Sequence, residues 1–248
     1  MPELIPGVHI VEMTPPSFGP GGPMNLCLLV AEGEATLIDA GLPGVSAPLL
    51  AYLAEIGLPP EAIKRIIVTH HHIDHVGGLP EIIALTGAEV WAHKKDAPLI
   101  DGSTPRPAIP PERLEARLAQ VPAEAREAAI ARMKHMADIP PVPVDLRLVG
   151  GEELNLLGGV EILHAPGHTA GHLVLYLPAE SLLIAGDLMR YQEGVIRESP
   201  PDFALDAAEA LASARRIAAH LPFERFIGYH GGYMVSGAKK LLSESLVG

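Results

Sequence analysis

The sequence predicts a layered α/β fold in one domain, on two observations. Apolar runs rich in Val, Ile and Leu alternate along the chain with segments of helical periodicity, as expected for strands packed against helices. Apolar residues make up 48% of the chain, which is enough for a sizeable core. A length of 248 residues would also fit two small domains, but layered α/β and β-sandwich folds often reach this size as one domain. We therefore expect a single domain over residues 1–248.

The individual elements follow from local patterns along the chain. In the first half, strands are expected at 25–31, 35–39, 63–68 and 88–92, and helices at 46–56 and 80–86. The second half is also rich in strand patterns, at 146–149, 160–163, 173–177, 181–185 and 225–229. Two amphipathic segments there, 205–221 and 234–246, are expected to be helices.

Residues 97–145 differ from the rest of the chain in their frequent prolines. These prolines bound two short helical patterns, at 111–120 and 123–137, which favours an insertion laid over the core. The segment also carries scattered apolar side chains that would suit a pocket wall, namely Ile109, Leu114, Leu118, Met133, Met136 and Ile139. A lid over a functional site and a plain surface excursion both fit this pattern.

The chemistry of the chain is concentrated in the stretch from Thr69 to Gly78, between an expected strand and an expected helix. Residues two apart at a strand end face the same way, so His70 and His72 share one side. After the corner, Asp74 and His75 can meet at a second point nearby. Imidazole and carboxylate are ligands that zinc and related metals prefer, so the stretch indicates two metal ions held close together. The alternative is a polar loop that is rich in histidine by chance.

Further residues of ligand type follow other expected strands. His168 and His172 lie in a segment after one strand, and Asp187 and His230 each follow another. Active sites of α/β folds commonly gather at such strand ends, on loops held by a rigid scaffold. We therefore expect these side chains to converge on the histidine cluster.

Five segments in this order resemble the motifs of the metallo-β-lactamase-fold superfamily. They are Asp39-Ala40-Gly41, the His-x-His-x-Asp-His core at 70–75, Gly-His-Thr-x-Gly-His at 167–172, Gly186-Asp187 and His230-Gly231-Gly232. The resemblance covers most of the chain. It implies a four-layer αβ/βα sandwich, with two mixed β-sheets face to face and helices outside.

The resemblance also implies the roles of the residues. One metal ion would be bound by His70, His72 and His168. The other would be bound by Asp74, His75 and His230, with Asp187 bridging the two. Asp39 would support a ligand by hydrogen bonds, and His172 would support its loop. The implied cofactors are two divalent ions, with zinc preferred and iron or manganese as alternatives.

This layout favours hydrolysis. Two ions that share a water lower its pKa, and the resulting hydroxide attacks an electrophilic centre. Asp74 is a candidate both for a ligand and for the group that takes up the proton. Tyr191 and Arg190, just beyond Asp187, are candidate donors to a developing oxyanion, as a tyrosine is in the lactonases of the family. Tyr191 stands slightly farther from the aspartate than the lactonase tyrosine does.

Features that the chain has or lacks limit the choice among the branches of the superfamily. Asp187 and the absence of an export signal argue against a secreted β-lactamase, and His72 stands where flavodiiron reductases carry glutamate. Glyoxalase II is near in size, but its terminal motif and basic tail are not matched. The expected activity is hydrolysis of a small ester, lactone or thioester. A mononuclear-iron persulfide dioxygenase, a promiscuous phosphodiesterase, a weak β-lactamase and a non-catalytic binding role remain alternatives.

The composition limits the classes of partner that the protein is expected to bind. A formal net charge of -12 argues against nucleic acid and favours a small-molecule substrate. We expect no membrane span. The single cysteine, Cys27, allows no internal disulfide and fits a reducing, cytoplasmic location, and a homodimer is left open. The remaining histidines are expected to be surface or hydrogen-bonded core residues; they are His9, His71, His93, His135, His164 and His220.

Overall fold

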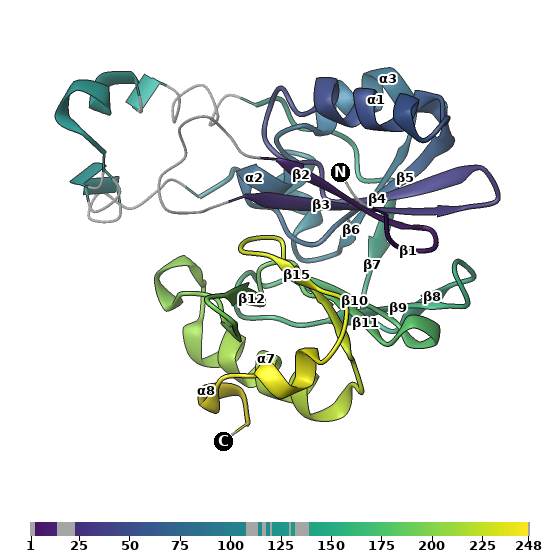
Figure 1. Ribbon diagram of the computed structural model, residues 1–248. Helices are drawn as coiled ribbons and strands as arrows, with labels where there is room; N and C mark the ends of the chain where they lie inside the picture. The colour runs from purple at the N-terminus through teal and green to yellow at the C-terminus, as the bar shows by residue number, and fades with distance from the viewer. Residues whose placement is uncertain are drawn as a thin grey trace.

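The computed structural model describes residues 3–13, 23–107, 114–115, 118–119, 121–128, 130–131 and 139–247. Two β-sheets face each other, and helices cover the outer face of each (Figure 1). The predicted fold class, a four-layer sandwich with two mixed sheets, is therefore confirmed.

The first sheet has seven strands in sequence order, β1 to β7. Its first four strands pair antiparallel, and β4 to β7 pair parallel. The carboxyl ends of β4, β5 and β6 therefore meet at one edge of the sheet, where Asp39 and the histidine cluster follow. The strands are β1 Glu3–Ile5, β2 Val8–Met13, β3 Met24–Ala31, β4 Glu34–Ile38, β5 Ile63–Val68, β6 Glu89–His93 and β7 Leu146–Leu148.

The second sheet has six strands in the order β15-β14-β11-β10-β9-β8. Only β11 and β14 pair parallel in it. Its strands are β8 Glu152–Leu154, β9 Val160–His164, β10 Leu173–Leu177, β11 Leu182–Ile184, β14 Arg225–Ile227 and β15 Tyr233–Met234. A separate hairpin, β12 Met189–Gln192 with β13 Val195–Glu198, follows β11 directly after Asp187.

Helices α1 and α3 lie on the outer side of the first sheet, and α7 and α8 on the outer side of the second (Figure 1). Helix α7 begins where the Asp206 side chain accepts a hydrogen bond from the backbone N–H of Glu209, an N-terminal cap. The helices are α1 Ser46–Glu55, α2 Ile73–Val76, α3 Leu79–Thr86, α4 Ala97–Ile100, α7 Ala207–His220 and α8 Glu244–Val247. The 3-10 turns are η1 Pro60–Ala62, η2 Ala123–Ala125, η3 Pro178–Glu180, η4 Pro201–Phe203 and η5 Ala238–Leu241.

The four layers enclose three apolar cores. Neighbouring residues of one strand point to opposite faces, so Leu28 belongs to the core under α1 and α3, whereas Leu29 packs between the two sheets. Similarly, Leu175 lies between the sheets and Val174 lies under α7. Strands buried on both faces need continuous apolar sequence, which is the pattern that predicted them.

Several elements differ from the expectation. The helix expected at 234–246 is wrong, because Tyr233–Met234 pairs with β14 and only η5 and α8 follow. Gly237, with φ at 71°, separates the strand from η5. Strands β1 and β8 and the β12–β13 hairpin carried signals too short or too polar to be predicted, and the apolar strand β2 was missed.

The insertion between β6 and β7 begins with α4 and returns through Val142, which is buried in the first core. The Arg106 side chain donates hydrogen bonds to the carbonyls of Leu99 and Ile139 and so joins its two ends. Most of the two expected helices lies outside the described residues, as do Ile109, Met133 and Met136. The lid therefore stays a prediction. Among the described residues, no helix has the length and apolar character to cross a membrane.

Candidate metal centre

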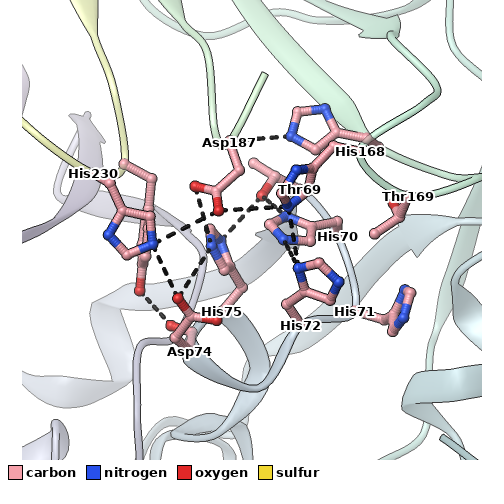
Figure 2. Close-up of polar contacts among 12 residues, drawn as sticks. Thr69, His70, His71, His72, Asp74, His75, His168, Thr169, Asp187 and His230 are labelled. Atoms are coloured by element: carbon pink, nitrogen blue, oxygen red, sulfur yellow. Dashed lines mark hydrogen bonds and ion pairs between the residues drawn. The ribbon is translucent and has the colours of Figure 1, made fainter. Parts of the chain in front are cut away.

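The histidine cluster sits at the carboxyl end of β5, a strand with parallel neighbours on both sides. Thr69 continues the strand, and α2 begins after His72, whose carbonyl accepts hydrogen bonds from the N–H groups of His75 and Val76. This tight turn carries Asp74 and His75 back beside His70, as Figure 2 shows. The corner predicted from the sequence therefore directs its side chains to one place.

The first ligand group consists of His70, His72 and His168. The Nε2 atoms of His70 and His168 lie 3.0 and 3.1 Å from Nδ1 of His72. Burial lowers the pKa of all three imidazoles and neighbouring histidines add to this, whereas the charges of Asp74 and Asp187 oppose it at His72 and His168; the pKa of His72 falls to about 3. Three neutral rings thus turn nitrogen atoms toward one point, which is the arrangement that a divalent metal requires of imidazole ligands.

The second ligand group consists of Asp74, His75, Asp187 and His230, whose ligand atoms all lie within 4.8 Å of one another. Nε2 of His230 lies 3.0 Å from Oδ2 of Asp74. Burial alone would lower the pKa of His75, but the charges of Asp39, Asp187 and Asp74 raise it well above its usual value. The carboxylates around His75 therefore stabilise a positive charge at this place.

Asp187 lies between the two groups. Its Oδ2 atom is 3.5 Å from Nε2 of His168, in the first group, and 3.6 Å from Nε2 of His230, in the second. Its Oδ1 atom is 3.4 Å from Nε2 of His75. Burial would raise the pKa of this carboxyl, but the surrounding histidines hold it well below its usual range, so it is ionised. One carboxylate thus faces both groups.

The buried atoms without a hydrogen-bond partner include two that face each other in this centre, Nε2 of His75 and Oδ1 of Asp187. Buried polar atoms without partners are rare in folded proteins, and one cause is an ion that belongs at the site. Their position in a cluster of imidazole and carboxylate groups fits a divalent metal. The residues present therefore suit the metal ions that the resemblance implies.

Asp39 and His172 contact candidate ligands from outside the two groups. Asp39 adopts a left-handed backbone conformation, with φ at 63°, at the end of β4. Its carboxylate lies 2.9 Å from Nδ1 of His75 and accepts hydrogen bonds from the backbone and hydroxyl of Thr69. It thereby turns Nε2 of His75 toward the other ligand atoms of the second group. Nε2 of His172 accepts a hydrogen bond from the backbone N–H of Asp187 at 3.1 Å.

Two further residues at the centre were not predicted. The Tyr229 hydroxyl donates a hydrogen bond to the backbone carbonyl of Asp74, and its ring lies 3.7 Å, centroid to centroid, from that of His75. The buried carboxylate of Asp96 accepts hydrogen bonds from residues beside His70 and His168. No sequence signal marks Asp96, since it follows two lysines in an ordinary turn, whereas Tyr229 directly precedes a predicted ligand.

Tyr191 and Arg190 lie on β12. The Tyr191 ring packs against Gly232, next to His230, and its cross-strand partner is Ile196 of the core under α7. Within the described residues, Tyr191 forms no hydrogen bond to either ligand group. The oxyanion role of Tyr191 and Arg190 therefore stays a prediction.

The other histidines fall mainly into supporting positions. His71 turns away from the ligand groups (Figure 2) and bonds to Asp96. His9 bonds to the Tyr52 hydroxyl at 2.8 Å, and the rings of His93 and His164 stack 4.1 Å apart. His220 bonds to a backbone carbonyl of its own helix. His135 lies outside the described residues.

A pocket of ≈ 350 Å³ adjoins the centre. His168 and Asp187 form its inner wall, and the rest of the lining is largely apolar and comes from η4, the loop after β13 and the start of α7. The contributing side chains include Leu188, Ala204, Ala207, Ala208 and Leu211, with Glu198 as a further charged group. The pocket is thus small, and mostly short side chains define its shape.

Comparison with known proteins identifies the family. Residues 20–230 match the family model described as the Metallo-beta-lactamase superfamily. The protein belongs to this superfamily. The resemblance drawn from the sequence is therefore confirmed. Members of the superfamily are mostly metal-dependent hydrolases, and this member has histidine and aspartate groups of the kind that bind divalent metals.

Relatives of this superfamily member include proteins named hydroxyacylglutathione hydrolase. The hydroxyacylglutathione hydrolase of Cereibacter sphaeroides is 30% identical over 221 residues, 87% of this chain and 65% of the relative. That of Pseudomonas aeruginosa is 36% identical over 149 residues, 59% of this chain and 40% of the relative. The chain thus spans less than two thirds of these relatives. The uncharacterized protein YobT of Bacillus subtilis is 28% identical over 228 residues, 88% of each protein.

Solved structures of the superfamily share the fold. A metallo-beta-lactamase family protein from Thermus thermophilus superposes with a TM-score of 0.68 at 27% identity, covering 96% of this chain and 77% of that one. An archaeal superfamily protein from Sulfolobus tokodaii gives a TM-score of 0.64 at 21% identity, covering 95% and 82%. The second likeness concerns the fold alone.

Proposed function

We propose that this superfamily member binds two divalent metal ions, preferably zinc, and hydrolyses a small thioester, ester or lactone. The observation that carries the proposal is the position of Asp187, whose carboxylate faces both ligand groups. Each group has enough donor atoms for one ion, and the shared carboxylate is what a dinuclear centre needs. The hydroxyacylglutathione hydrolases among the relatives favour a thioester within this range.

The first ion would be held by His70, His72 and His168, and the second by Asp74, His75 and His230, with Asp187 shared. Such ions supply an activated water and polarise a carbonyl oxygen. Among the residues that would hold the ions, His70 and His75 are fully buried, whereas Asp74 and His230 are partly exposed.

Asp74 is the group placed to accept a proton during the reaction. One of its carboxylate oxygens lies 3.0 Å from Nε2 of His230 and 3.9 Å from Nε2 of His75. Burial would raise the pKa of Asp74, but these two histidines lower it, so the carboxylate is ionised. Its hydrogen bond to His230 fixes its orientation, and the backbone bond from Tyr229 fixes its position.

The adjoining pocket favours a small apolar acyl group. It touches the centre at His168 and Asp187 and continues between Leu188, Ala208 and Leu211. Burial of apolar substrate surface against such a lining contributes about 25 cal/mol per Å². A phosphodiester would call for a denser set of cationic donors than this lining provides. The overall charge of -12 also disfavours a polyanionic substrate.

The experiment is metal analysis of the protein purified without oxygen, followed by assays on a substrate panel. The panel contains hydroxyacylglutathione thioesters, lactones, a phosphodiester and a β-lactam, and oxygen uptake is measured with a persulfide. We expect close to two ions per chain and the highest kcat/KM on a thioester or lactone. A single iron with oxygen uptake would favour a persulfide dioxygenase instead, and faster phosphodiester cleavage would overturn the substrate class.

We also propose that the enzyme is cytoplasmic. Its one cysteine, Cys27, is buried and unpaired, which suits a reducing compartment. Fractionation of the source cells, with activity measured in each fraction, tests this location. Activity confined to an exported fraction would contradict it.

A further inference from the structure

We propose that Asp96 is a positioning residue that holds together the two loops from which the first metal ion is bound. The inference rests on the proposed function only in requiring that the centre binds metal. It concerns how His70 and His72, from one loop, are kept in register with His168, from another.

Asp96 is bonded to both loops at once. Its Oδ2 atom accepts a hydrogen bond from the backbone N–H of His71 at 3.0 Å and lies 3.0 Å from the ring atom Nδ1 of the same residue. The same oxygen accepts a bond from the Thr169 hydroxyl at 2.7 Å, and Oδ1 accepts one from the backbone N–H of Gly171 at 2.7 Å. Thus two contacts fix the first loop and two fix the second.

The partners of Asp96 stand directly beside the ligands. His71 lies between His70 and His72, and Thr169 follows His168. A shift of either partner would therefore move a ligand, although Asp96 faces no metal itself. The three ligand nitrogens lie within about 3 Å of their neighbours, so a small relative movement of the loops would separate them.

The two loops belong to opposite sides of the sandwich. The first follows β5 of one sheet, and the second connects β9 to β10 of the other. Asp96 follows β6, next to β5, and reaches across to the second sheet. The first ligand group thus spans the interface between the two sheets, and Asp96 is a fixed link across that interface.

The site around Asp96 is built for a carboxylate. Asp96 is only 1% exposed, and Gly171 must be glycine because a Cβ there would lie 2.5 Å from the Oδ1 atom of Asp96. Four hydrogen-bond donors around one buried carboxylate satisfy both oxygens. Hydrogen bonds to a charged acceptor are about twice as strong as neutral ones, so the link is stiff.

Within the second ligand group, His75 has supports of its own. His75 is oriented by Asp39 and packs against Tyr229, and neither of these residues contacts Asp96 through a described hydrogen bond. Loss of the Asp96 carboxylate is therefore expected to weaken one ion selectively. A residue that merely stabilises the fold would not distinguish the two ions.

The test replaces the acceptor while keeping its shape. Asp96→Asn puts an amide N–H₂ where a carboxylate oxygen now accepts bonds, so one or more donors of the two loops lose their partner. Removal of a supporting hydrogen bond commonly lowers metal affinity about 10- to 100-fold. We expect a loss of this size for one ion in titrations against a competing chelator, with the other ion retained.

Three further variants sharpen the test. Thr169→Val removes one bond to Asp96, whereas Thr169→Ser keeps the hydroxyl and should restore wild-type affinity. Asp145→Asn is the matched control, since Asp145 bonds the backbone of Val90 at the opposite end of β6. A cooperative thermal unfolding transition shows whether each metal-free variant is folded. If Asp96→Asn is unfolded, Thr169→Val is used in its place.

The outcomes separate this inference from the proposed function. Wild-type protein that binds no metal overturns both. Wild-type protein that binds two ions, with an Asp96→Asn variant that binds both as tightly or loses both equally, overturns the positioning role alone. A selective loss of one ion, with rescue by Thr169→Ser and no effect of Asp145→Asn, supports it.

Discussion

Asp187 is the residue whose replacement tests the shared centre most sharply. Its carboxylate oxygens lie 3.4 Å from Nε2 of His75, 3.5 Å from that of His168 and 3.6 Å from that of His230. Asp187→Asn keeps the size of the side chain but removes its charge and one acceptor. Because the side chain faces both ligand groups, we expect both ions to bind more weakly.

The size of the effect follows from the charge that is removed. Two unit charges about 4 Å apart interact by about 4 kcal/mol at an effective dielectric constant of about 20, a value that suits groups in a partly open site, and a divalent ion doubles this to about 8 kcal/mol. Since about 1.4 kcal/mol is a tenfold change, this energy corresponds to more than roughly 10⁵-fold in affinity. Rearrangement and water entry reduce it, and we expect a loss of at least roughly a hundredfold for each ion.

The assay is a chelator competition that yields both dissociation constants, with thermal unfolding of the metal-free protein alongside. Asp202→Asn is the control, since Asp202 is an exposed carboxylate on η4. We expect the control to match the wild type and Asp187→Asn to lose turnover while it remains folded. An Asp187→Asn protein that keeps two ions at wild-type affinity would refute the shared role of this carboxylate.

Three further predictions concern other parts of the molecule. Tyr191→Phe should slow lactone or thioester turnover by on the order of a hundredfold with metals retained, if its hydroxyl stabilises an oxyanion, since one such donor is worth about 2.7–4 kcal/mol; an unchanged rate removes Tyr191 from the mechanism. Burial raises the pKa of the Cys27 thiol, and the charge of Asp39 adds to this, so a thiol reagent should label it only after unfolding; rapid labelling of folded protein would contradict its burial. Burial lowers the pKa of His9 against the opposing charge of Glu3, so the unfolded chain binds a proton more readily. Stability should therefore fall as pH decreases through about 6.5, and less so in His9→Gln; parallel pH profiles of unfolding free energy would contradict this.

Most of the fold could be predicted from the sequence because its long strands are buried on both faces. The run Leu173–Leu177 is apolar throughout because it serves two cores, and such runs are easily recognised. Short edge strands such as β8, Glu152–Leu154, have no such run and were not predicted. The C-terminal segment was misjudged because its apolar residues fit a helical period, although Tyr233 pairs with Ile227 of β14.

The clustering of the candidate ligands could be predicted, and that of the residues around them only in part. His70 to His75 lie within one corner, where local geometry shows which side chains share a face. The supporting roles of Asp39 and His172 were assigned only through the family resemblance. Asp96 lies 25 residues from His71 and 73 from Thr169, so its contacts exist only once the two sheets have packed together. No local pattern distinguishes such a residue from a surface aspartate in a turn.

The most direct test of the dinuclear hydrolase is a metal titration followed by activity. Metal-free protein is titrated with zinc while hydrolysis of a hydroxyacylglutathione thioester or a lactone is measured at each step. The two complete ligand groups predict that activity rises until two equivalents of zinc per chain have been added and then stays constant. Full activity at one equivalent, or full activity in the metal-free protein, would contradict the account.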